Sequence, residues 1–228
     1  MTLARRQDGT VSVPLRTAAL FVVSLVLLAA FGARGEFEGD DLQTVVPMLN
    51  LPAALDGDLL IYRYDIQPMT YWLGHGIYRL SGSVDAVFLL PAVSIALAIA
   101  IQDVIIRRIC GRGGVVTLCI LLLMPEIIFS GLFFNPSAPG YAAASAAAAL
   151  ALAGRRSLVA GAGAGGCLAL AVLFRIDFAL VVPGILAIMA LRDRSVIPAA
   201  VGAGVLVLLL VVAVATGFVR LPVLLETL

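Results

Sequence analysis

Two adjacent carboxylates, Asp40 and Asp41, are the side chains of this sequence with the clearest capacity for acid–base chemistry. They lie in the one long polar segment of the chain, 34–84, which contains seven of the 14 acidic residues. Adjacent carboxylates in a partly dehydrated site repel each other, and this repulsion favours proton uptake by one of them. One interpretation is that one carboxylate acts as a general base. The other is that the pair only caps the short segment 42–51 that follows. Neither role excludes the other.

A second candidate for chemistry is the charged pair Arg175 and Asp177, which interrupts a long apolar region. Ionised groups at membrane depth are costly, so they are usually paired or functional. The two residues form a structural ion pair or snorkel towards lipid headgroups. Alternatively, Arg175 binds a phosphate group, to which a planar guanidinium is well suited. Arg63 is a further phosphate candidate, with an exposed loop arginine as the alternative.

Two more polar side chains have open roles. Glu126 follows Pro125 inside an apolar stretch, where a carboxyl group either forms structural hydrogen bonds or faces a substrate. His75 is the only histidine, so a metal site with several histidines is excluded. Its side chain is a polar group at a membrane interface, or else a sugar contact or proton relay. A divalent cation at Asp40 and Asp41 stays open, because two carboxylates alone do not define a metal site.

The composition indicates where these groups act. Of 228 residues, 62% are hydrophobic and 13% are charged, whereas soluble domains have about 45–50% apolar and about 25% charged residues. The sequence therefore predicts an all-α polytopic membrane protein and excludes a soluble nucleotide-binding domain, a coiled coil or a disordered chain. The net charge of +1 gives no reason to expect nucleic acid as a partner.

Seven apolar stretches follow one another, most of them long enough for a helix that crosses a bilayer. We predict membrane spans at 17–33, 85–106, 115–134, 137–153, 157–174, 178–191 and 196–218. The sixth is short for a full crossing, so its helix must extend into the flanking residues or tilt little. The chain is then a single module over 1–228, with the first span, the polar loop 34–84, and six spans over 85–218.

The placement of arginines predicts the orientation, since positively charged short loops stay in the cytoplasm. All 15 basic residues are arginines, and ten of them lie in segments that are inside if the N-terminus is inside. The loop 34–84 is then extracytoplasmic. An alternative for the first span is a cleaved signal peptide, because Arg5 and Arg6 precede it, although its apolar run exceeds a usual signal core.

Two short amphipathic helices are expected within the outer loop. One is 42–51, and the other is 67–73, with Pro68 at a plausible first helical position and with Tyr71 and Trp72 after it. Aromatic side chains of this kind are typical of the membrane interface. We expect both helices to lie at the membrane surface and to frame a cleft above the bundle.

This order of features resembles the start of the GT-C superfamily of membrane glycosyltransferases, which includes protein mannosyltransferases and the lipid A aminoarabinose transferase. The motifs that carry the resemblance are Glu38-Gly39-Asp40-Asp41, Tyr62-Arg63-Tyr64-Asp65-Ile66-Gln67-Pro68-Met69-Thr70-Tyr71, Phe134-Asn135-Pro136 and Leu173-Phe174-Arg175-Ile176-Asp177. The likeness covers essentially the whole chain. Each motif is short, so the resemblance depends more on the order of the motifs within the topology than on any single motif.

The resemblance implies an inverting glycosyltransferase in a bacterial inner (plasma) membrane. A sugar would pass from a polyprenyl-phosphate donor to an extracytoplasmic acceptor hydroxyl of a glycan, lipid or protein, with Asp40 as the base and Asp41 where the family has glutamate. No cofactor is implied with certainty. Because relatives usually continue beyond seven spans, we expect a minimal core, a fragment truncated at its C-terminus, or a degenerate homologue. With the residues above, the candidate substrate-binding set is Arg63, Asp65, Gln67, His75, Glu126, Asn135 and Arg175.

Two other functions remain as alternatives. A transporter or flippase of a lipid-linked or small polar substrate predicts an internal repeat and ionisable residues near mid-span. The sequence has no clear repeat, and most of its ionisable residues lie at span ends. The second alternative is a non-catalytic membrane subunit that needs a partner.

The glycine-rich segment 161–166 spells the nucleotide-binding pattern GxGxxG. That pattern works when a strand precedes it and a helix follows, whereas this copy lies inside an apolar span. We therefore predict close helix packing through small residues at this segment.

Overall fold

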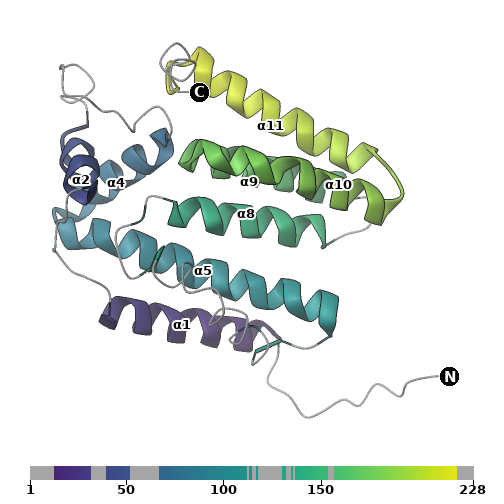
Figure 1. The fold of residues 1–228 in the computed structure, drawn as a ribbon, viewed down its shortest axis with the longest axis horizontal. Coiled ribbons are helices and arrows are strands. Elements are labelled where there is room, and N and C mark those ends of the chain that lie inside the picture. The colour runs from purple at the N-terminus through teal and green to yellow at the C-terminus, as the bar shows by residue number, and fades with distance from the viewer. Residues whose placement is uncertain are drawn as a thin grey trace.

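The protein, analysed as a computed structural model, is described over residues 13–31, 40–51, 67–111, 113–114, 117, 130–131, 135, 137–153 and 157–219. Every regular element in these ranges is a helix, which confirms the predicted all-α class (Figure 1). The elements are α1 (Val13–Phe31), α2 (Asp40–Leu49), α4 (Pro68–Ser81), α5 (Val84–Cys110), α8 (Ala138–Ala151), α9 (Leu158–Phe174), the 3₁₀ helix η1 (Ile176–Val181), α10 (Val182–Asp193) and α11 (Ile197–Ala215).

The apolar stretches expected from the sequence coincide with helices wherever the structure describes them. Two of the helices, α5 and α11, are long and apolar enough to cross a membrane, and α1 and α9 are apolar but have shorter qualifying segments. The stretch 115–134 lies outside the described residues except at 117, 130 and 131. Seven membrane spans therefore stay a prediction, while an apolar helical bundle is observed.

The short sixth stretch, 178–191, gains length on its N-terminal side. Arg175 is extended, with φ −162° and ψ 127°, and ends α9. The chain then forms η1 and continues directly into α10, so helical structure runs from Ile176 to Asp193. A 3₁₀ helix rises about 2.0 Å per residue and an α-helix about 1.5 Å, so the combined element spans about 30 Å. This is about the thickness of a bilayer's hydrocarbon core.

The bundle is built as a row of helices (Figure 1). Going along the row, α1 packs on α5, α5 on α8, α8 on α9, and α9 on α11, while α10 contacts α8 and α11. Helix α2 packs on α4, and α4 contacts α5 and α9 beside the ends of the helices, next to the start of α5 (Figure 1). The described segments of the loop 34–84 thus lie against the same end of the bundle at which α8 begins and α9 finishes.

Glycines allow α9 and α11 to lie backbone to backbone. A Cβ added at Gly161 would meet the Pro198 carbonyl oxygen at 2.5 Å, and one at Gly165 would collide with the backbone of Gly202. Small residues permit such close approach in membrane-type helix pairs. The prediction that the glycine-rich segment serves helix packing is confirmed.

The other end of the bundle is rich in arginine. Nη1 of Arg108, from α5, donates to the Ala149 carbonyl at 3.0 Å, and Nη1 of Arg192, from α10, donates to the Ala151 carbonyl at 2.5 Å. Both carbonyls belong to the last turn of α8, where helix carbonyls lack intrahelical partners and the helix dipole favours positive charge. Two neighbouring helices therefore cap α8 with guanidinium groups.

A buried carboxylate, Asp103, fastens the chain to this arginine-rich end. It is fully buried, and its Oδ1 accepts from the Gly114 N–H at 2.6 Å and from the Thr117 hydroxyl at 2.8 Å. Its Oδ2 pairs with Arg107 at 2.5 Å. A buried charge is tolerated when it is paired and hydrogen-bonded, so Asp103 connects α5 to the segment that follows it.

The close contact between α9 and α11 predicts unequal effects of two neighbouring substitutions. Gly165→Ala should lower the free energy of unfolding by about 1–3 kcal/mol, because the new methyl group would push apart two backbones that cannot yield. Gly166→Ala is the matched control, since no atom lies within 4 Å of its added Cβ, and it should stabilise the helix by up to about 1 kcal/mol. Thermal unfolding in detergent compares the two; equal melting temperatures would contradict the packing described here.

Removal of the Asp103 carboxylate should be costly. Asp103→Ala leaves Arg107, the Gly114 N–H and the Thr117 hydroxyl without their shared partner, and we expect a loss of about 3–5 kcal/mol in the free energy of unfolding. Asp85→Ala removes an exposed acid from the first turn of the same helix and should cost about 1 kcal/mol or less. Chemical denaturation in detergent measures both, and a similar loss for the two variants would refute an anchoring role for Asp103.

Candidate functional site

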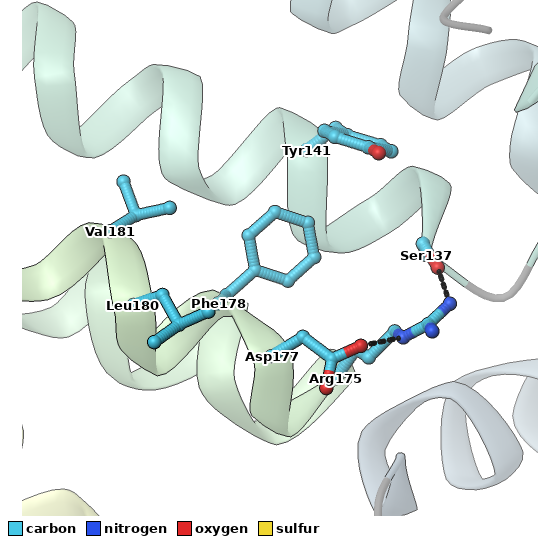
Figure 2. A pocket seen from close by; sticks show the side chains of 7 residues that line it. All are labelled: Ser137, Tyr141, Arg175, Asp177, Phe178, Leu180 and Val181. Carbon is cyan, nitrogen blue, oxygen red and sulfur yellow. Dashed lines mark hydrogen bonds and ion pairs between the residues drawn. The ribbon is translucent and has the colours of Figure 1, made fainter.

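A pocket of about 330 Å³ lies where α8 begins and α9 ends. Figure 2 shows its lining residues: Ser137, Tyr141, Arg175, Asp177, Phe178, Leu180 and Val181. The extended backbone at Arg175 separates α9 from η1, so the arginine projects from a break between two helices. Residues from α8 and from the junction of α9 with η1 together form the walls.

The guanidinium of Arg175 is held at two of its nitrogens. Nε donates to the Asp177 carboxylate at 2.6 Å, and Nη1 donates to the Ser137 hydroxyl at 2.6 Å (Figure 2). A guanidinium has five N–H donors in a fixed fork. Among the described residues, none accepts a hydrogen bond from Nη2 of Arg175. The Arg175 side chain is 42% exposed, so this edge of the fork is accessible to a ligand.

Asn135 fixes the position of Ser137. Its Oδ1 accepts from the Ser137 backbone N–H at 2.8 Å, and its Nδ2 donates to the Ser130 hydroxyl at 3.0 Å. Ser137 is buried and stands directly before α8. Asn135, a candidate from the sequence, thus reaches the site through Ser137 and does not itself line the pocket.

The remaining wall of the pocket is apolar and aromatic. The rings of Tyr141 and Phe178 meet edge to face, with centroids 5.2 Å apart. Phe178 packs over Gly140, where a Cβ would collide with its ring, so glycine at this position in α8 makes room for the aromatic side chain. Leu180 and Val181 continue the apolar wall and are exposed. The pocket therefore places one guanidinium beside an apolar surface that faces outward.

Helix α4 docks on the residue directly before Arg175. The Thr70 hydroxyl donates to the Phe174 carbonyl at 3.2 Å, and Phe174 is the residue before Arg175. Thr70 is fully buried, and Gln67, at the start of α4, is 2% exposed. Gln67 directly precedes the helix that makes this contact, but it does not line the pocket, and its predicted role in substrate binding stays a prediction.

His75 takes part in a contact between the two loop helices. Its Nδ1 lies 3.1 Å from the Met48 carbonyl of α2, and its ring meets Trp72 edge to face at 6.4 Å. The Met48 side chain occupies the space over Gly74, where a Cβ would collide with it. The observed contacts of His75 hold α2 on α4.

The remaining candidates are the acidic pair Asp40 and Asp41 together with Arg63, Asp65 and Glu126. The backbone of Asp40 and Asp41 forms the first turn of α2, but their side chains lie outside the described part of the structure, as do Arg63, Asp65 and Glu126. No group of three or more metal-ligating side chains occurs among the described residues. Helix α2 packs on α4 and α4 on α9, so the acidic turn and Arg175 belong to elements at the same end of the bundle.

Five pocket residues were not singled out from the sequence: Ser137, Tyr141, Phe178, Leu180 and Val181. The one available signal was Ser137 before Ala138-Pro139, an arrangement typical of a helix start. Tyr141 and Phe178 are ordinary apolar positions by sequence pattern. Comparison with models of protein families, with curated proteins and with solved structures gives no significant match.

The docking of α4 predicts a local effect of losing one hydroxyl. Thr70→Val keeps the shape of the side chain but leaves the buried Phe174 carbonyl without this donor, which should cost about 1–3 kcal/mol. Hydrogen exchange over 68–81 should become faster while α9 stays protected. Ser81→Ala, at the exposed end of the same helix, serves as the control; unchanged exchange in the Thr70 variant would exclude the docking role.

Proposed function

We propose that the protein is a membrane enzyme that transfers a sugar from a polyprenyl-phosphate donor to an acceptor hydroxyl at the extracytoplasmic face. The observation that carries the proposal is the pocket at Arg175. It combines a partly exposed guanidinium, oriented by Ser137 and Asp177, with the apolar wall of Tyr141 and Phe178. A phosphate ester of an apolar alcohol needs both kinds of surface, since its headgroup is anionic and its chain is not.

The arrangement of charges supports the membrane orientation in this proposal. Arg107, Arg108 and Arg192 belong to one end of the bundle, where α5, α8 and α10 end. The pocket lies at the opposite end, where α8 begins and α9 ends. If arginine-rich ends stay in the cytoplasm, Arg175 faces the extracytoplasmic side, together with the helices of the loop 34–84.

The chemistry would proceed in a single displacement. The acceptor oxygen attacks the anomeric carbon of the donor, and the bond between that carbon and the phosphate oxygen breaks. Asp40 or its neighbour Asp41 takes the proton from the attacking hydroxyl, while the polyprenyl phosphate leaves with the bonding electron pair. Arg175 stabilises the charge that builds up on the leaving phosphate, as fixed cationic donors do in such transition states. The sugar is transferred with inversion.

Activity of the purified protein on polyprenyl-phosphate sugars tests this proposal. Asp40→Ala or Asp41→Ala should reduce turnover by a factor of about 10² or more, as expected for loss of a general base. Arg175→Gln should reduce turnover and weaken binding of the donor. The rate of sugar transfer to an acceptor, followed with a radiolabelled donor in nanodiscs, measures these effects.

Two substitutions at the same end of the bundle serve as controls. Asp85→Ala and Arg79→Gln remove exposed charges near the pocket end without touching pocket residues, so both variants should retain activity. Full transfer activity of the Asp40, Asp41 and Arg175 variants would contradict the proposal. Movement of an intact lipid-linked substrate across proteoliposomes without sugar transfer would instead favour a transporter.

A further inference from the structure

Asp177 places a negative charge next to Arg175, the one positive charge among the described residues that line the pocket. Its carboxylate accepts from Nε of Arg175 at 2.6 Å, and its side chain is 61% exposed. The other described lining side chains are uncharged: Ser137, Tyr141, Phe178, Leu180 and Val181. The formal charges of the described lining therefore cancel, although no described residue accepts a hydrogen bond from Nη2 of Arg175.

This cancellation matters because two lipid phosphates in the proposed reaction differ in charge. The donor is a phosphodiester and carries one negative charge. The leaving polyprenyl phosphate is a monoester, which carries about 1.5 to 2 negative charges at neutral pH, as phosphate monoesters do. The second charge is attracted by Arg175 but is also repelled by Asp177 at short range, so the monoester gains less from the pocket than it would from an unpaired guanidinium.

We propose that Asp177 is a specificity-determining residue that makes the Arg175 pocket bind a lipid phosphodiester in preference to a lipid phosphate monoester. This inference rests on the proposed function. Its consequence is release of the lipid product: once the sugar has been transferred, the phosphate gains charge and binds less tightly to the same pocket. A simple ion pair for structure alone would not discriminate between the two lipids.

Asp177→Asn isolates the charge, because the amide oxygen can still accept from Nε of Arg175. Binding of a polyprenyl phosphate and of the same polyprenyl phosphate esterified with a sugar is measured in nanodiscs by native mass spectrometry or by competition. We expect the wild-type protein to prefer the diester. In Asp177→Asn, affinity for the monoester should rise about three- to tenfold relative to the diester, as expected for one screened charge interaction.

Three further variants separate failure of the role of Asp177 from failure of the proposed function. Asp177→Glu keeps the charge and should keep the preference, and Asp85→Asn, which removes the same charge at the same end of the bundle outside the pocket, should leave it unchanged. If Arg175→Gln weakens binding of both lipids while Asp177→Asn leaves their affinity ratio unchanged, the role of Asp177 is refuted and the proposed function stands. If Arg175→Gln affects neither lipid, both proposals fall.

Discussion

The constraint on which this structure depends is that a charge in an apolar bundle must meet a partner. Ionised groups are expensive where water is scarce, and nearly two thirds of this chain is hydrophobic. The described structure satisfies the constraint at both ends of the helices. Asp103 is surrounded by donors at one end, and Arg175 is held by Ser137 and Asp177 at the other.

The two solutions differ in exposure, and the difference distinguishes a structural role from the ligand-binding role that we propose for Arg175. Asp103 is fully buried, and all its described partners come from its own helix or from the chain just after it. Its Oδ1 accepts two hydrogen bonds within the fold and its Oδ2 pairs with Arg107, so the carboxylate stabilises the structure. Arg175 is partly exposed and is bound at only two nitrogens by described residues. Its partners orient the guanidinium without enclosing it, as a site for an anion requires.

The sequence predicted the helices well because apolar length is read directly from composition. The positions of α5, α8, α9 and α11 follow from runs of hydrophobic residues bounded by arginine, serine or glycine. Less predictable was η1, since nothing in the apolar pattern distinguishes a 3₁₀ turn from an α-helical one. The helices α2 and α4 were expected from capping and proline signals, but the bundle end on which they pack is a tertiary property.

The site was predictable only in part, because some of its residues stand out in the sequence and others are brought together by tertiary packing. Arg175, Asp177 and Asn135 stood out because polar side chains interrupt apolar runs. Ser137, 38 residues from Arg175 in the chain, is joined to it only by the packing of α8 on α9. Phe178 and Tyr141 are indistinguishable from lipid-facing residues until their rings are seen to meet over Gly140. Long-range pairings of this kind are set by helix packing, which periodicity does not encode.

The docking of α4 on α9 connects the packing of the helices to the geometry of the candidate site. If the loop 34–84 did not pack on the bundle, it would have no fixed distance to Arg175, and the carboxylates that we propose as bases could not be held near the arginine. The buried Thr70 hydrogen bond to Phe174 gives α4 a defined place beside the arginine, and the contact of His75 with the Met48 carbonyl fastens α2 to α4. Since α2 begins with Asp40 and Asp41, a short series of side-chain contacts connects the acidic turn to the phosphate-binding candidate. Preorganisation of this kind is what converts a set of polar residues into a site, because groups already held near their working geometry lose less entropy when the substrate binds.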